Sequence, residues 1–214
     1  MSDVYARVER VVTRGIFSLD GGDFEVDNNI WLVGDDDEVM VIDAAHDAGP
    51  IVAAVAGRTV VAIVCTHGHD DHINAALDLA DAVGGTAISI HADDRFLWDV
   101  VHPNRAPDAL VASGDTIEVA GVRLHVRHTP GHSPGGVCLI APELATVFSG
   151  DTLFNGGPGA TGRSFSDKAT LLASIERDLF PLAPETLVRT GHGDATTIGV
   201  ERAAFEAGEP NWLL

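Results

Sequence analysis

A buried strand that runs directly into a histidine cluster is the strongest constraint in this sequence. Residues 59–65, TVVAIVC, are continuously apolar and rich in β-branched side chains, which is typical of a strand covered on both faces. The strand leads into residues 66–72, THGHDDH, where three histidines stand beside two aspartates. Imidazole nitrogens and carboxylate oxygens are ligands that suit Zn, Fe or Mn. We therefore expect a metal site at the end of this strand.

The spacing within this cluster predicts two neighbouring ions. In an extended stretch His67 and His69 project to the same side, because side chains alternate with a period of two. Gly68 between them relieves the crowding of side chains that converge on one ion. Asp71 and His72 open the helix that follows and point elsewhere, so they can serve a second ion nearby.

Three further candidate ligands each follow a strand-like segment and a small residue. They are His132 in TPGHSPGG, Asp151 in VFSGDTLF and His192 in VRTGHGD. A ligand on a tight turn at a strand end requires such small neighbours. Together with the cluster they supply five histidines and two aspartates, about the number that two ions sharing a bridging carboxylate and a bridging hydroxide need.

The apolar pattern of the whole chain predicts mixed sheets covered by helices, an α/β (α+β) fold. Strands are expected at residues 8–13, 29–33, 38–42, 59–65, 87–90, 115–119, 122–127, 136–140, 145–149 and 186–189. Helices are expected at residues 47–57, 75–83 and 167–179, with a short one starting near 198. Residues 34–38, GDDDE, predict a tight acidic hairpin turn.

The composition favours one acidic globular domain spanning residues 1–214. The formal net charge is -19 and the hydrophobic fraction is 45%, which is ample for a buried core. The charge argues against nucleic acid and anionic membranes as partners and leaves a small-molecule substrate.

No apolar run approaches the ~20 residues of a membrane span. The charged N-terminus is unlike a signal peptide, and Cys65 and Cys138 fit buried free thiols, so we expect a cytoplasmic protein. Nothing in the sequence bears on the oligomeric state.

The ordered set HGHDDH, GH at 131–132, SGD at 149–151 and GH at 191–192 resembles the metallo-β-lactamase superfamily. The resemblance runs from Asn28 to about Glu201 and implies a four-layer αββα sandwich with the site at one edge, where the strand ends meet. It implies that the first metal is held by His67, His69 and His132, and the second by Asp71, His72 and His192, with Asp151 as the bridging carboxylate. Asp43, which ends the strand MVID, resembles the early aspartate that supports ligand histidines in this family.

GDTLF, followed by a glycine-rich stretch and Gly162-Arg163, is most similar to the glyoxalase II-like branch, whose members hydrolyse thioesters. The resemblance implies two divalent metal ions, Zn with Fe or Mn as alternatives, and a bridging hydroxide that attacks the carbonyl carbon. Asp151 would orient that hydroxide, while Asp71 helps to fix the second ion, and we take both as catalytic. Arg163, Phe154 and Phe165 are candidate substrate contacts, although Arg163 fits a structural ion pair equally well.

Three questions stay open at this point. Full-length glyoxalase II proteins carry a C-terminal helical domain that binds glutathione, whereas this chain ends 22 residues after His192 on an acidic tail. The thiol carrier is therefore glutathione, mycothiol or a similar low-molecular-weight thiol. A mononuclear iron persulfide dioxygenase that uses His67, His132 and Asp151 as a facial triad is one alternative reaction. A lactonase or other ester metallohydrolase is the other.

Several remaining side chains have ordinary structural interpretations. Surface or supporting positions are expected for the histidines that belong to no motif, which are His46, His91, His102, His125 and His128. Phe96 and Trp98 fit the apolar stripe of a helix packed on the core, with a wall of the substrate cleft as the alternative.

Overall fold

The computed structural model describes residues 6–213 and contains two six-stranded sheets. The first has the order β1-β2-β3-β4-β5-β6, with strands β1 (Arg7–Leu19), β2 (Gly22–Gly34), β3 (Glu38–Ile42), β4 (Thr59–Val64), β5 (Ile88–His91) and β6 (Ala109–Val111). The second has the order β14-β13-β10-β9-β8-β7, with strands β7 (Thr116–Val119), β8 (Val122–His128), β9 (Val137–Ala141), β10 (Thr146–Gly150), β13 (Leu187–Thr190) and β14 (Thr196–Thr197). A small hairpin consists of β11 (Leu153–Phe154) and β12 (Gly157–Pro158). Residues 1–5, which hold part of the charged N-terminus used in the export prediction, lie outside the described residues, as does residue 214.

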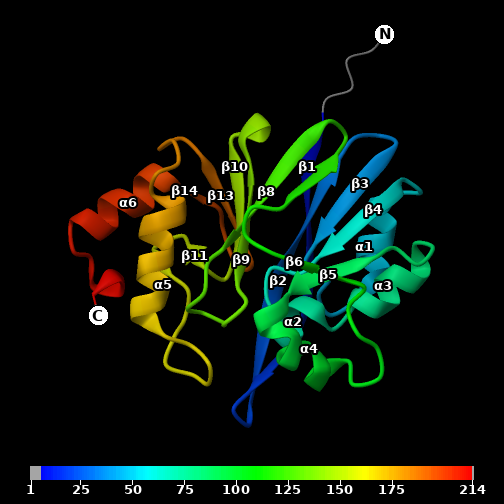
Figure 1. Cartoon of the computed structure of the whole chain (residues 1–214), viewed down its shortest axis with the longest axis horizontal. Coiled ribbons are helices and arrows are strands. Elements are labelled where there is room, and N and C mark those ends of the chain that lie inside the picture. Colours follow the sequence, from blue (N-terminus) through cyan, green and yellow to red (C-terminus); the bar gives the residue numbers. More distant parts are fainter. Residues whose placement is uncertain (1–5, 214) are drawn as a thin grey trace.

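Helices cover the outer face of each sheet (Figure 1). The first sheet carries α1 (Ala48–Val55), α2 (Asp70–Ile73), α3 (Ala76–Ala82) and α4 (Arg95–Val101), and the second carries α5 (Lys168–Ser174) and α6 (Ile198–Glu206). The chain thus forms helix, sheet, sheet and helix layers, and the predicted four-layer αββα sandwich is confirmed. No helix within residues 6–213 is both long enough and apolar enough to cross a bilayer.

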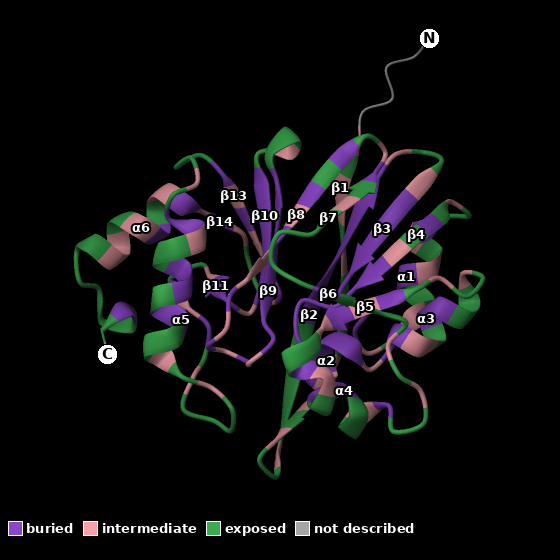
Figure 2. Cartoon of the chain, in the orientation of Figure 1, coloured by how far each residue is buried: buried purple, intermediate pink, exposed green. Residues whose placement is uncertain are grey.

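Alternating side chains of the strands build three apolar layers. Figure 2 shows the central strands of both sheets as buried. In β2, Ile30 and Leu32 face the helices of the first sheet, whereas Trp31 and Val33 face the second sheet. All four are at most 4% exposed, because a central strand between two layers buries both of its faces. The third layer lies between the second sheet and α5 and α6.

The largest difference between the structure and the sequence prediction is the length of the β1–β2 hairpin. A strand was expected only over residues 8–13, but β1 pairs with β2 along its full length, from Arg7 opposite Gly34 to Leu19 opposite Gly22. Asp20 and Gly21 form the two-residue turn with φ of 53° and 77°, the left-handed conformation that favours an Asp-Gly pair. The far half of the hairpin is partly exposed, so its sequence lacks the apolar run of a buried strand.

Other differences are local. The single helix predicted over 75–83 is preceded by a separate turn of helix, α2, and α5 continues into a π-helical turn, Ile175–Leu179. The strands β6, β11, β12 and β14 were missed, because two or three residues show no periodicity. Trp98 is fully buried as expected. Phe96 is 41% exposed and lies outside the predicted core stripe, and its ring packs against that of Phe165. Cys65 and Cys138 are buried and free.

Replacing Phe148 with alanine is expected to lower the free energy of unfolding by about 3–5 kcal/mol, since it leaves a cavity between the sheets. Phe148 is fully buried, and its ring centroid lies 6.1 Å from that of Trp31. Urea denaturation followed by circular dichroism measures the loss. The control is Val100→Ala on α4, where the side chain is 78% exposed and a change within about 0.5 kcal/mol is expected. Equal stability of the two variants would contradict the inter-sheet packing.

Candidate metal centre

The seven predicted ligands come together at one edge of the sandwich, from the loops that follow four strands. The loop after β4 and the start of α2 carry His67, His69, Asp71 and His72, while the loops after β8, β10 and β13 carry His132, Asp151 and His192. Both sheets therefore contribute. Six of the seven lie in two compact groups, and the seventh, Asp151, contacts both.

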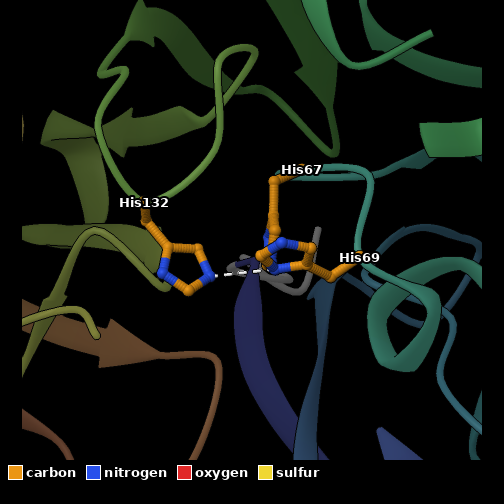
Figure 3. A group of neighbouring side chains, drawn as sticks. All are labelled: His67, His69 and His132. Carbon is orange, nitrogen blue, oxygen red and sulfur yellow. Dashed lines mark hydrogen bonds between the residues drawn. The ribbon is translucent and has the colours of Figure 1, made fainter. Parts of the chain in front are cut away.

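The first group consists of three imidazoles whose nitrogens converge (Figure 3). His69 Nδ1 lies 3.0 Å from His67 Nε2 and 3.0 Å from His132 Nε2. Two nitrogens on one tetrahedral ion are about 3.3 Å apart when each metal–nitrogen bond is about 2.0–2.1 Å. His67 and His69 are buried, and His132 is half-buried, so the nitrogens are close enough to share one ion.

The second group consists of Asp71, His72 and His192. Asp71 Oδ2 lies 3.3 Å from His192 Nε2 and 3.6 Å from His72 Nε2, and the two Nε2 atoms are 3.3 Å apart. The donors are again spaced as around a single ion. Since His69 points into the first group and Asp71 and His72 into the second, the spacing argument from the sequence matches the geometry.

Asp151 lies between the two groups. Its Oδ2 is 3.5 Å from both His132 Nε2 and His192 Nε2, and its Oδ1 is 3.4 Å from His72 Nε2. Among the described residues Oδ1 has no hydrogen-bond partner, although it is buried. An unpaired buried carboxylate oxygen is costly, and a cation at this point satisfies it. The donor set and this orphaned oxygen therefore fit divalent metal ions.

Hydrogen bonds on the outer side of the rings aim the ligand nitrogens inward. His132 Nδ1 donates to the Ala160 carbonyl at 2.8 Å, and His192 Nδ1 donates to the Asp27 carbonyl at 2.9 Å. A carbonyl can only accept, so each Nδ1 carries the proton and each Nε2 keeps its lone pair for a metal.

Asp43 orients two more of the histidine rings, those of His72 and, through Thr66, His67. Its Oδ2 accepts from His72 Nδ1 at 3.0 Å and from Thr66 Oγ1 at 2.8 Å, while its Oδ1 accepts from the Thr66 backbone N–H at 2.7 Å. Thr66 Oγ1 in turn accepts from His67 Nδ1 at 3.1 Å. One buried carboxylate therefore fixes a ring in each group, which is the supporting position implied by the resemblance.

The two groups differ electrostatically. Burial, followed by the nearby His132, lowers the pKa of His69 to about 3, and burial also holds the pKa of His67 well below its usual range, so these two imidazoles are neutral. Burial also lowers the pKa of His192, but Asp151 and Asp71 outweigh it and raise this pKa to about 10, so a metal ion must displace a proton from Nε2 to bind there. Burial raises the pKa of Asp151, yet His72 and His192 together hold it well below its usual range. Both carboxylates of the centre, Asp71 and Asp151, are therefore ionised.

The supporting residue Asn28 was missed in the sequence, whereas a supporting position is among those expected for His46. Asn28 donates from Nδ2 to Asp71 Oδ2 at 3.1 Å, and its Oδ1 accepts from His46 Nε2 at 2.8 Å. Asn28 stands within a strand and His46 within no motif, so only the folded chain shows this connection to the second group. The remaining motif-free histidines lie outside both groups: His91 stacks on His128 at 4.0 Å, while His102 and His125 bond to other parts of the scaffold.

A small cavity of about 50 Å³ opens beside the first group. Its walls include His69 and His132, Phe17 from the β1–β2 hairpin, and Arg163 from the glycine-rich loop. The Arg163 guanidinium lies over the Phe24 ring, 4.5 Å from its centroid. The structure thus brings Arg163 to the ligands of the first group.

The other two predicted substrate contacts lie on different sides of the centre. The ring of Phe154 is 6.1 Å from that of His192, beside the second group. Phe165 is 62% exposed and packs edge-on against Phe96 at 4.8 Å, at the surface rather than in the cavity.

Two His/Asp groups joined by a carboxylate at the edge of an αββα sandwich define a metal-binding hydrolase scaffold. The model of the metallo-beta-lactamase superfamily matches residues 24–192, and the chain belongs to this superfamily of hydrolytic enzymes. It is similar to the hydroxyacylglutathione hydrolase GloC of Haemophilus influenzae, with 31% identity over 190 residues that cover 81% of this chain and 89% of that protein.

Two solved structures support the same assignment. The BLEG-1 B3 metallo-beta-lactamase matches with a TM-score of 0.74 and 28% identity, covering 87% of this chain and 95% of its own. TTHA1623, determined in a di-iron-bound form, matches with a TM-score of 0.71 and 33% identity, covering 83% of this chain and 93% of its own.

Replacing His132 with alanine is expected to remove the ion of the first group and to leave that of the second, because the first group loses one of its three nitrogens. Metal analysis of the purified protein measures the ions per chain. The control is His125→Ala, since His125 lies on β8, outside both groups, and its Nδ1 contacts the Thr116 hydroxyl. Equal metal content in His132→Ala and His125→Ala would contradict the assignment of the first group.

Proposed function

We propose that this protein is a metal-dependent thioester hydrolase of the glyoxalase II type, acting on an S-acyl derivative of glutathione, mycothiol or a similar low-molecular-weight thiol. The observation that carries the proposal is the pair of donor groups sharing Asp151 beside a cavity that contains Arg163. The similarity to a hydroxyacylglutathione hydrolase supports a thioester in particular.

Each residue has a defined task in this proposal. His67, His69 and His132 would hold one divalent ion and Asp71, His72 and His192 the other, with Zn as the expected metal and Fe or Mn as alternatives. Bound there, such ions lower the pKa of water toward neutrality and polarise a carbonyl oxygen. Asp151 lies within 3.5 Å of ligand nitrogens of both groups, so its carboxylate would help to hold both ions and would orient the attacking water beside them. Asp71 is fixed by Asn28 and keeps its carboxylate on the second group.

A thioester fits a site of this kind because of its leaving group. The water oxygen forms a bond to the carbonyl carbon, the carbon–sulfur bond breaks, and the sulfur departs as a thiolate that later takes up a proton. A thiol has a pKa of about 8.5, so the thiolate leaves without a strong general acid. The reaction yields a carboxylic acid and a free thiol.

The cavity beside the first group supports an anionic substrate. Arg163 is held in place by its contact with Phe24, and a guanidinium in this position suits a carboxylate of the acyl group or the thiol carrier. Phe154 offers an apolar surface at the second group. Phe165 packs against Phe96 at the surface, so it would touch only a part of the substrate that extends outside the cavity.

The composition supports the kind of substrate and the cellular compartment in this proposal. A formal net charge of -19 favours a small-molecule substrate over nucleic acid or an anionic membrane. Two buried free thiols suit the reducing cytoplasm, where we place the reaction.

A substrate panel tests the reaction. Protein of known metal content is expected to release thiol from S-lactoylglutathione or an acyl-mycothiol, measured with a thiol-reactive dye, and to act weakly on lactones and simple esters. One iron per chain with oxygen consumption on a glutathione persulfide would instead establish the dioxygenase. Faster hydrolysis of lactones than of every thioester would establish the ester hydrolase.

The Arg163→Gln variant is expected to raise KM for a carboxylate-bearing thioester by about tenfold or more, because a charge-assisted hydrogen bond contributes about 1.5–3 kcal/mol. The kcat value and the KM of an uncharged thioester should change little. Arg123→Gln is the matched control, since Arg123 pairs with Glu143 on the second sheet. Equal KM values for the two variants would show that Arg163 does not bind the substrate.

A further inference from the structure

Asp94 is a buried carboxylate outside the predicted ligand set. It stands at the start of α4 and is fully buried. An aspartate at this position commonly accepts a hydrogen bond from the first turn of its own helix, but the Asp94 side chain makes no such bond. Its oxygens face two loops elsewhere in the chain.

Three hydrogen bonds join Asp94 to these loops. Its Oδ2 accepts from the Gly68 backbone N–H at 2.8 Å and from Ser133 Oγ at 2.7 Å. Its Oδ1 accepts from the Gly135 backbone N–H at 2.6 Å. Both oxygens are therefore used, and all three donors are buried.

The two loops are those that carry the first metal group. Gly68 stands between His67 and His69 in the loop after β4, and Ser133 directly follows His132 in the loop after β8. These loops belong to different sheets. The Asp94 carboxylate therefore spans the interface across which the three imidazoles must meet.

The backbone approaches Asp94 so closely that glycine is required in both loops. A Cβ atom at Gly135 would lie 2.6 Å from the Asp94 backbone nitrogen, and one at Gly68 would lie 2.8 Å from Leu97 Cβ and 3.0 Å from Asp94 Cβ. Contacts under 3.0 Å force something to move, so the two loops are packed against one fixed residue.

We propose that Asp94 is a positioning residue that sets the distance of His132 from His67 and His69, and thereby the affinity of the first metal ion. The inference rests on the metal sites of the proposed function. It assigns to Asp94 no contact with the ion or the substrate, since its carboxylate acts only through the two loops.

The exchange Asp94→Asn tests this assignment with almost no change of shape. An amide has one oxygen and one NH₂ group, and whichever way it lies, its NH₂ group faces a backbone N–H, that of Gly135 or that of Gly68. Two donors then oppose each other, and one buried N–H loses its acceptor. One loop must shift relative to the other.

The experiment compares Asp94→Asn with Asp78→Asn, the same exchange at an exposed side chain of α3 that belongs to none of the His/Asp groups. Zn²⁺ affinity is measured by competition with a chromogenic chelator, and Co²⁺-loaded protein is followed by its visible spectrum. In Asp94→Asn the first ion should bind about 10–100-fold more weakly with an altered Co²⁺ spectrum, while the second ion binds as before. Asp78→Asn should match the unsubstituted protein in both measurements.

Two results would overturn the inference. One is wild-type affinity for both ions in Asp94→Asn. The other is an equal loss of both ions together with a lower melting temperature of the metal-free protein, which would make Asp94 a scaffold residue only. If Asp94→Asn does not fold, Ser133→Ala replaces it. This exchange removes one hydrogen-bond donor to Asp94 without placing two donors against each other, and it should lower the affinity of the first ion alone. Failure of the unsubstituted protein to bind any ion would instead refute the proposed function itself.

Discussion

The metal centre depends on the packing of the two sheets against each other. Trp31, Met40 and Ile42 of the first sheet meet Leu139 and Phe148 of the second in a buried apolar layer. Packed sheets keep their strand directions close to aligned, so the ends of strands from both sheets meet at a common edge. Ligands from loops more than a hundred residues apart thus converge without a long element of their own. The packing of the sheets brings the loops together, and the loops then orient the side chains toward one another.

Buried carboxylates and amides outside the two groups orient the side chains that make up these groups. Asp43 fixes a ring in each group, Asn28 fixes Asp71, and Asp94 joins the loops of the first group. Each is at most 1% exposed, and in such surroundings a hydrogen bond to a charged group is strong and a missing partner is costly. The ligand positions are therefore held by networks whose members tolerate little change.

The sequence predicted the side chains that meet in the two groups better than the residues that support them. His67 and His69 are recognisable because their spacing is local, and His132 and His192 because each follows a glycine at a strand end. Most regular elements were predicted for the same reason, since their periodicity lies within a short window. Asp94 carries no comparable signal: its partner Gly135 is 41 residues away, and the contact exists only after the sheets have packed. The hairpin beyond residue 13 was missed because its exposed half lacks an apolar pattern.

An acidic protein can still bind an anionic substrate if its positive charge is local. The charge of -19 is spread over the whole chain, and its repulsion is screened over about 8–10 Å at physiological ionic strength. Cations in the two donor groups would lie among buried side chains, where salt screens them far less. Arg163 stands next to them, held by the Phe24 ring. In the proposed reaction, attraction would therefore act mainly on a group that has entered the cavity, and the geometry of entry, more than long-range steering, would select the substrate.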